Sequence, residues 1–252
     1  MNVGAWHILP SGVGSTASRW TLIVLLVFCA CPAVAADEIV ISVKASDGEI
    51  VRYVLTSGGS APRYAVILMP GGRGELPLRQ ADGVLTTALP GDFLIRSRAL
   101  FVDSQFVAAS TAATSIPALI LAIEHDLERR FGPLSLYVVG TSRSTEATQA
   151  LAAPLDGRVA GFVHTSSMAT IASFDPRKFR SRHLLVAHRD DGCPVTSPSA
   201  AIASHDRFGT DLILVDGGEA VGDVCSPSAH HGYRGIEKET IDRIKAWIRQ
   251  GK

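Results

Sequence analysis

A serine at position 142 stands in a pattern that can display a nucleophile. The stretch from Val138 to Ala150 reads VVGTSRSTEATQA, so an apolar run ends at a glycine and Ser142 follows two residues later. A helix-like segment begins immediately after it. A strand-to-helix turn of this kind would raise the serine hydroxyl above a sheet, near the positive end of the helix.

A nucleophilic serine needs a base that takes its proton and an acid that orients the base. Two loops in the second half of the chain carry such groups. The first, HRDDGCPVTSP, contains Asp190 and Asp191, and the second, CSPSAHHGYRGIE, contains His230 and His231. Each loop follows an apolar run, so both are expected beyond the ends of strands.

Apolar runs and helical periodicity predict the elements that position these loops. A hairpin is expected over 38–57 around an Asp-Gly turn. Further strands are expected at 64–69, 106–110, 134–139, 160–166, 183–187 and 211–215, and helices at 116–131, 145–153 and 236–250. This alternation predicts a single domain over 37–252, a three-layer α/β sandwich with a mostly parallel central sheet of about eight strands.

The segment Gly140-Thr141-Ser142-Arg143-Ser144 resembles the Gly-x-Ser-x-Gly motif of the α/β-hydrolase family, with Ser144 in place of the second glycine. In that family the acid and then the histidine follow the serine along the chain. The resemblance implies Asp191 as acid, with Asp190 as the alternative. It implies His231 as base because a glycine follows it, with His230 as the alternative.

The resemblance also implies two backbone donors for the oxyanion that forms in acyl transfer. One is the N–H of Arg143, directly after the nucleophile. The other comes from the loop MPGGRGEL, where Arg73 is expected and Gly72 is the alternative. The expected reaction is hydrolysis of a small-molecule ester, thioester or amide through an acyl-enzyme, with no organic cofactor and no metal.

Two alternatives to an esterase stay open. One is a serine peptidase with the same fold that acts on short peptides. The other is a binding protein that keeps the fold without the chemistry, because Ser144 departs from the motif. Sequence alone leaves the substrate and the oligomeric state undetermined, since one fold supports many reactions.

The beginning of the chain has the features of an export signal. Arg19 precedes the apolar run TLIVLLVFCACPAVAA, which ends in small residues, so cleavage is expected after Ala35 or Ala36. Residues 1–36 are therefore predicted to be a signal peptide that is removed on export. An uncleaved anchor is the alternative, and export would place the mature chain in the periplasm or outside the cell.

Two cysteines, Cys193 and Cys225, remain after the signal peptide is removed. In an oxidising compartment they are expected to form a disulfide, which would join the Asp191 loop to the His231 loop. A metal site built from both cysteines with His230 and His231 is the competing interpretation. Its spacing matches no compact zinc motif.

The composition of the chain argues against several classes of protein. The 252 residues include 24 basic and 24 acidic side chains, so the formal net charge is zero, and 46% of the residues are hydrophobic. That hydrophobic fraction is typical of a folded protein rather than a disordered one. Balanced charge gives no basis for a nucleic acid or an anionic membrane surface as a partner.

Overall fold

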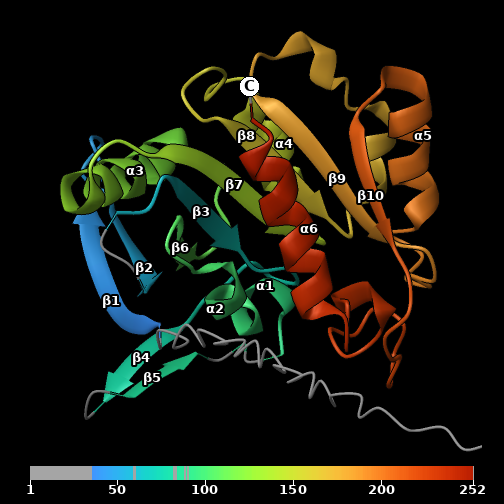
Figure 1. The fold of residues 1–252 in the computed structure, drawn as a ribbon, viewed down its shortest axis with the longest axis horizontal. Coiled ribbons are helices and arrows are strands. Elements are labelled where there is room, and N and C mark those ends of the chain that lie inside the picture. The colour runs from blue at the N-terminus through green and yellow to red at the C-terminus, as the bar shows by residue number, and fades with distance from the viewer. Residues whose placement is uncertain (1–35, 59–60, 82–83, 88, 90, 252) are drawn as a thin grey trace, which may run out of the picture. The chain divides into compact units, whose positions relative to one another are not determined.

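An eight-stranded sheet forms the centre of the computed structural model, which describes residues 36–58, 61–81, 84–87, 89 and 91–251. Strand β2 is antiparallel to both of its neighbours, and the other neighbouring pairs are parallel (Figure 1). In spatial order the strands are β1 (Asp37–Lys44), β2 (Ile50–Ser57), β6 (Phe106–Thr111), β3 (Tyr64–Met69), β7 (Ser135–Thr141), β8 (Gly161–Thr165), β9 (Arg182–His188) and β10 (Asp211–Val215).

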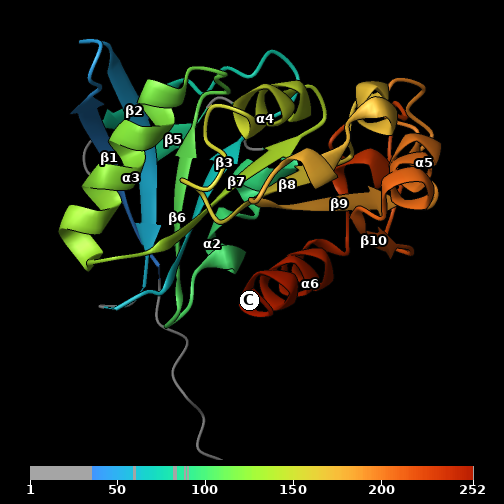
Figure 2. The same cartoon turned by 90° about the horizontal axis from the view of Figure 1, so that it is seen from above.

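Helices cover both faces of this sheet (Figure 2). One face carries α3 (Pro117–Phe131), α4 (Ser144–Ala152) and α5 (Pro198–Phe208), and the other carries α1 (Phe93–Arg96), α2 (Arg98–Phe101) and α6 (Glu237–Arg249). Alternate strand residues face opposite layers, so Ile67 packs with the α3 side and Leu68 with the α6 side. This explains why β3 is apolar at consecutive positions.

The fold class predicted from the sequence is confirmed, including the N-terminal hairpin and the mostly parallel sheet. The predicted signal peptide lies outside the described residues apart from Ala36, and the domain limits 37–252 stay a prediction. Helix α5 was not predicted, because its sequence PSAAIASHDRF has small residues where a strong apolar stripe would stand. Its signals were at its ends, where Ser197 caps the first turn and Gly209 is left-handed.

The stretch between β3 and β6 is made of short elements. It contains the two single-turn helices α1 and α2, which meet at Ser97, and a small hairpin of β4 (Leu78–Ala81) and β5 (Val84–Thr87). Phe93, Leu94 and Ile95 of α1 are at most 2% exposed. Burial of this one turn against the sheet therefore fixes it, although it is too short to be stable as an isolated helix.

The parallel strands end together at one edge of the sheet. Met69 is opposite Gly140 in the β3–β7 pair, and Thr141 is opposite Thr165 in the β7–β8 pair. The loops that follow these strands therefore start from one edge, where ligands bind in open α/β sheets. The loops that carry Ser142, Asp191 and His231 follow β7, β9 and β10, so all three leave from this edge.

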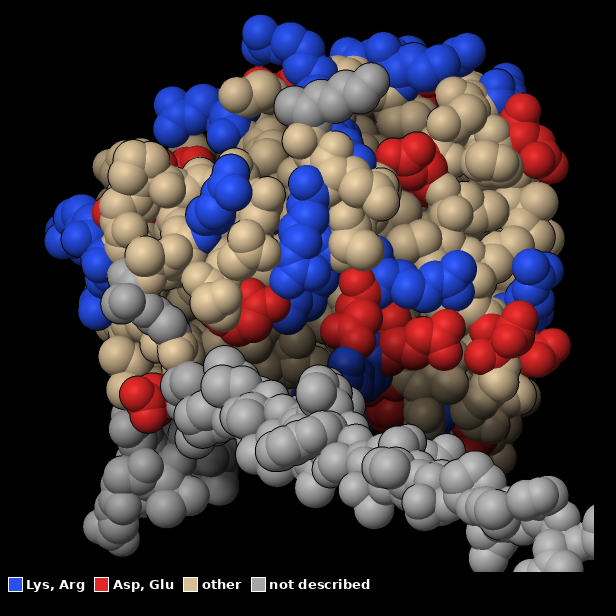
Figure 3. Space-filling model, in the orientation of Figure 1, with Lys and Arg blue, Asp and Glu red and all other residues tan. Residues whose placement is uncertain are grey.

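Charges of both signs are interspersed on the face shown in Figure 3. The two longest described helices, α3 and α6, have 15 and 13 residues. None of the described helices combines the length and apolar character needed to cross a bilayer.

Two buried histidines, His164 of β8 and His183 of β9, face each other on the α4 side of the sheet. The Nε2 atom of His164 is 3.1 Å from Nδ1 of His183, whose ring stacks on Phe162 at 5.2 Å and contacts Phe174 and Phe179. Burial among these rings lowers the pKa of His183 to about 4 and holds the pKa of His164 well below its usual value. Both imidazoles are therefore neutral in the folded protein at neutral pH.

This pair should make the protein less stable in mild acid. The pKa of His183 is lower in the folded protein than in the unfolded chain. The stability that depends on a neutral His183 is therefore fully present above about pH 6.5 and is lost as the pH falls toward about 4. The shift corresponds to about 3 kcal/mol of unfolding free energy. His183→Asn, which removes the titration and keeps an atom able to bond His164, should reduce the loss measured by urea unfolding between pH 7.5 and pH 4.5.

His125→Gln provides the matched control, because His125 lies exposed on α3, away from the pair. The control should keep the wild-type dependence of unfolding free energy on pH. Equal pH dependence in the wild type and in His183→Asn would contradict the assignment.

Candidate active site

Ser142 occupies a sharp turn between β7 and α4. Its φ is 54°, in the left-handed region that non-glycine residues rarely adopt. The turn is held because the Ser142 N–H donates to the carbonyl of Thr165, on the neighbouring strand β8, at 2.9 Å. A strained serine between a strand and a helix has the geometry of a nucleophile elbow, in which the hydroxyl projects above the sheet.

Ser144, the departure from the family motif, is accommodated by hydrogen bonds. Its side chain is buried, and its hydroxyl accepts the Thr141 N–H at 2.9 Å. The same hydroxyl lies 2.9 Å from the carbonyl oxygens of Met69 and Thr141, to one of which it donates. The serine thus links the turn to the end of β3, so the turn does not need a second glycine.

Gly140, in contrast, admits no side chain. A Cβ atom there would lie 2.8 Å from the carbonyl oxygen of Ser144 and 2.9 Å from Cγ2 of Thr148. The first glycine of the motif is therefore required by close packing of the new helix against the strand.

His231 and Asp191 form a buried pair. The Nδ1 atom of His231 lies 3.0 Å from Oδ2 of Asp191, and the two residues are 8% and 6% exposed. The other carboxylate oxygen accepts the Cys193 N–H at 2.9 Å. Since a carboxylate only accepts, Nδ1 carries the proton, which leaves the lone pair of Nε2 free to take a proton.

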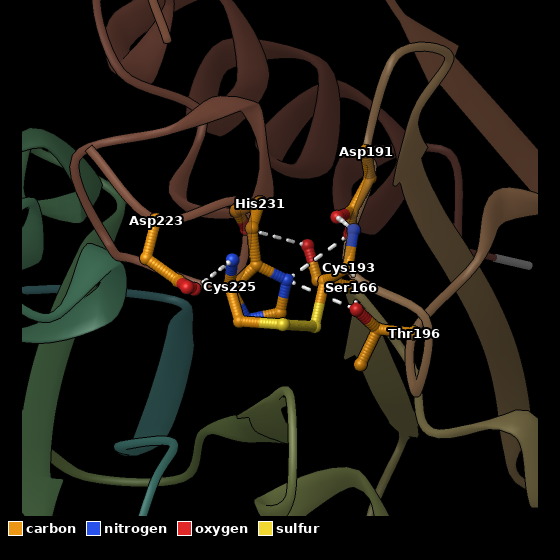
Figure 4. The surroundings of a disulfide bond; sticks show 7 residues. All are labelled: Ser166, Asp191, Cys193, Thr196, Asp223, Cys225 and His231. Atoms are coloured by element: carbon orange, nitrogen blue, oxygen red, sulfur yellow. Dashed lines mark hydrogen bonds and ion pairs between the residues drawn. A yellow bond between two sulfur atoms is a disulfide. The ribbon is translucent and has the colours of Figure 1, made fainter. Parts of the chain in front are cut away.

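Thr196, which the sequence analysis did not predict as a site residue, contacts both members of this pair. Its buried hydroxyl lies 3.1 Å from Oδ2 of Asp191 and 3.0 Å from Nδ1 of His231 (Figure 4). The hydroxyl donates to the carboxylate and presents its lone pairs to the imidazole N–H. Its only signal in the sequence was its position five residues after Asp191 in the same loop.

The alternative residues Asp190 and His230 lie outside this pair. The His230 ring stacks on His188 with centroids 4.4 Å apart, and its Nδ1 is 3.3 Å from the backbone carbonyl of Asp190. The Asp190 N–H in turn donates to Nδ1 of His188 at 3.0 Å. The structure therefore brings together Asp191 and His231 rather than their neighbours, and the roles of acid and base stay predictions.

Two further left-handed residues hold the His231 loop. Ser166 has a φ of 43° and Tyr233 a φ of 58°, and the Ser166 N–H donates to the Tyr233 hydroxyl at 2.9 Å. The Ser166 hydroxyl lies 2.8 Å from the carbonyl oxygen of His231. Burial raises the pKa of Tyr233, so its phenol stays protonated and donates to the carbonyl of Val186.

Ser142 and His231 line the same cavity, whose volume is about 440 Å³. Among the described residues, no hydrogen bond joins the Ser142 hydroxyl to the His231 imidazole. The remaining walls are mostly apolar and include Leu89, Phe93, Met168, Val195, Pro227 and both cysteines. The stretch before β6 thus supplies Leu89 and Phe93 to the wall.

The backbone donors expected for an oxyanion lie around this cavity. Gly72 and Arg143 line it together with Ser142, whereas Arg73 lines an adjoining cleft with Arg143. The Gly71 N–H already donates to Oδ2 of Asp92 at 2.9 Å. The cavity therefore favours Gly72 over Arg73 as the donor on this loop, and the roles of all three residues stay predictions.

Cys193 and Cys225 form the predicted disulfide, with Cα atoms 4.7 Å apart. The bond joins the Asp191 loop to the segment before His231 (Figure 4). Both sulfur atoms are used, so the thiolate ligands of the competing metal site are not available. A group of His188, Asp190 and His230 has ligand-like spacing, but both ring nitrogens of His188 are within hydrogen-bond distance of backbone groups.

The disulfide should stabilise the protein measurably. It closes a loop with a sequence separation of 32 residues, for which constraint of the unfolded chain gives about 4 kcal/mol before any native strain. The double variant Cys193→Ala/Cys225→Ala should therefore lower the free energy of unfolding by about 2–4 kcal/mol. Urea unfolding of the oxidised wild type and the variant checks this, and equal stabilities would contradict it.

Comparison with known proteins gives similarity at the level of the fold. No family model and no curated protein matches the sequence. The zinc-bound structure of a cold-adapted esterase from an Arctic intertidal metagenomic library is similar, with a TM-score of 0.56 and 14% identity, covering 88% of this chain and 96% of that one. XC6422 from Xanthomonas campestris, described as a serine hydrolase without a lid, has a TM-score of 0.56 and 9% identity, with coverages of 82% and 95%.

Similarity extends to a peptidase as well. Oligopeptidase B from Leishmania major has a TM-score of 0.52 and 9% identity, and the match covers 83% of this chain but 36% of the peptidase. These identities show the fold and leave the activity open. The strand order, the helices on both faces and these similarities together show that the chain has the α/β-hydrolase fold, as its sequence predicted.

Proposed function

We propose that this protein is an exported serine hydrolase that cleaves ester bonds through an acyl-enzyme on Ser142. His231 acts as the base and Asp191 as the orienting acid. One arrangement carries the proposal: a strained turn presents Ser142 to the cavity that is also lined by His231, whose Nδ1 is hydrogen-bonded to Asp191. The fold, shared with esterases, supports it.

The reaction has two halves. In the first, Nε2 of His231 takes the proton of Ser142 Oγ as that oxygen attacks the ester carbonyl carbon. The tetrahedral oxyanion is stabilised by the N–H of Arg143 and by Gly72, with Arg73 as the alternative. His231 then gives its proton to the leaving alkoxide, and a water molecule repeats the sequence on the acyl-enzyme.

Asp191 stabilises the imidazolium that forms in each half-reaction. The hydroxyl of Thr196 is well placed to assist, because it contacts both members of the pair. Loss of the orienting acid would let the imidazole rotate or change tautomer. A buried, hydrogen-bonded pair therefore keeps Nε2 directed toward the cavity.

The apolar walls of the cavity favour an uncharged acyl or alkyl group on the substrate. Thioesters and amides would enter by the same chemistry. Peptidase activity on short peptides is the second candidate, supported by the similarity to oligopeptidase B. Export to the periplasm or beyond is part of the proposal, and it is supported by the disulfide and by the predicted signal peptide.

Replacing the proposed nucleophile should abolish activity without unfolding the protein. Ser142→Ala deletes the attacking oxygen at a half-buried position, so ester turnover should fall by up to about a millionfold. Turnover of acyl esters of increasing chain length, with aminoacyl amides alongside, measures the loss and separates esterase from peptidase. Covalent labelling by a fluorophosphonate should occur at Ser142 in the wild type alone.

Ser199→Ala is the matched control, because this exposed serine lies on α5 away from the cavity. It should keep wild-type turnover and labelling. Retention of a tenth of the wild-type turnover in Ser142→Ala would exclude Ser142 as the nucleophile. A wild type that is neither active nor labelled would favour a binding protein.

The two adjacent histidines should differ sharply. His231→Ala should lose activity to the same extent as Ser142→Ala, because this imidazole alone is bonded to Asp191. His230→Ala should keep most of the turnover, since its ring stacks on His188 instead. A larger loss in His230→Ala than in His231→Ala would exclude His231 as the base.

A further inference from the structure

Asp92 is an acidic residue in the cavity wall that the proposed triad does not use. It caps α1, and its Oδ1 accepts the N–H groups of Leu94 at 3.0 Å and Ile95 at 3.2 Å. Its second oxygen, Oδ2, accepts the N–H of Gly71 at 2.9 Å. One carboxylate thus holds two separate elements, a helical turn and the loop that follows β3.

Capping alone does not explain a carboxylate at this place. Serine and asparagine cap helices about as well as aspartate, and neither brings a charge into a half-buried wall. Burial raises the pKa of Asp92, which shows that the charged form loses solvation there, while the three N–H groups counteract this. A serine or asparagine cap has a single acceptor oxygen in its side chain. Only a carboxylate has a second oxygen that can accept the Gly71 N–H while the first caps α1.

The bond to Gly71 matters because this glycine touches the nucleophile's turn. A Cβ atom on Gly71 would lie 3.1 Å from Cβ of Ser142 and 3.2 Å from the carbonyl oxygen of Thr141. The next residue, Gly72, is left-handed with a φ of 61° and lines the cavity. Gly71 therefore lies between the Asp92 carboxylate and the Gly72 peptide, in contact with the turn that carries Ser142.

The same helical turn holds the other side of the cavity. Arg96, in its last position, donates to the carbonyl of Gly232, directly after His231, and pairs with Glu237 of α6 at 2.9 Å. The ring of Phe93 lies 4.5 Å from that of Tyr233. Because α1 is buried in the core, it connects the Gly71 loop and the His231 loop to one rigid element.

We propose that Asp92 is a positioning residue for the oxyanion-binding loop: its carboxylate anchors the Gly71 peptide to α1 and so aims the Gly72 N–H at the reacting carbonyl oxygen. This inference rests on the proposed function. It assigns to Asp92 no contact with the substrate's reacting atoms. Because an oxyanion donor acts in the transition state, the loss of Asp92 should lower kcat more than it raises KM.

Asp92→Ser is the decisive variant, because serine keeps a cap for α1 but is too short to hold Gly71 as well. Its kcat on the best ester should fall by about 10- to 100-fold, the scale of a small misplacement, with KM changed by less than about threefold. Affinity for a boronic acid, which mimics the tetrahedral intermediate, should fall in parallel with kcat/KM. Amide hydrogen exchange in the peptide that contains residues 70–74 should become faster.

Asp92→Asn is the second variant, in case serine unfolds the protein. It keeps the volume but has one acceptor oxygen for three N–H groups, so kcat should fall in the same direction. Asp175→Ser is the matched control, since Asp175 caps a short 3-10 helix (Pro176–Lys178) outside the cavity. The control should keep kcat, inhibitor affinity and exchange at residues 70–74.

The results separate this inference from the proposed function. If the wild type hydrolyses esters and folded Asp92→Ser or Asp92→Asn keeps wild-type kcat, the inference is wrong and the function stands. Unchanged hydrogen exchange at 70–74 in both variants would overturn it as well. If the wild type neither hydrolyses esters nor is labelled at Ser142, the function falls and the inference with it, even where the variants speed exchange.

Discussion

The left-handed turn at Ser142 is the constraint on which the site depends. A non-glycine residue in this conformation costs about 1–2 kcal/mol, so it persists only where its surroundings over-determine it. Here a bond from the Ser142 N–H to β8, the buried hydroxyl of Ser144 and the close approach of Gly71 all fix the turn. These contacts come from β8, from the start of α4 and from the loop after β3. The packed sheet therefore stabilises the geometry that presents the hydroxyl.

Two other residues near the site have the same left-handed conformation. Ser142, Ser166 and Tyr233 are the left-handed non-glycine residues of the described chain, and the last two contact each other. Ser166 also holds the carbonyl of His231, while the disulfide joins the neighbouring loops. The rigid parts of the protein thus support its least regular backbone where the proposed chemistry takes place. A proposed triad assembled from three separate loops requires this support.

Particular residues show how far the sequence could predict the site. Ser142 was predictable because glycine, serine and a change from strand to helix periodicity are local signals. Asp191 and His231 needed the family resemblance, and the sequence left Asp190 and His230 one residue away. Thr196 and Asp92 were not predicted, since neither belongs to a motif and both act through hydrogen bonds to distant segments. Helix α5 was missed because alanine and serine gave it no strong apolar stripe.

The sequence by itself determined the order along the chain of the eight strands of the main sheet and of α3, α4 and α6, together with the hairpin at the start and the parallel character of the sheet. It could do so because burial on one or two faces leaves a periodicity in the chain. It also indicated the cysteine pair. Only the tertiary structure decided which aspartate meets which histidine and how Ser144 replaces a glycine. These choices depend on hydrogen bonds between residues 40 and 75 positions apart, and such contacts leave no local pattern in a single sequence.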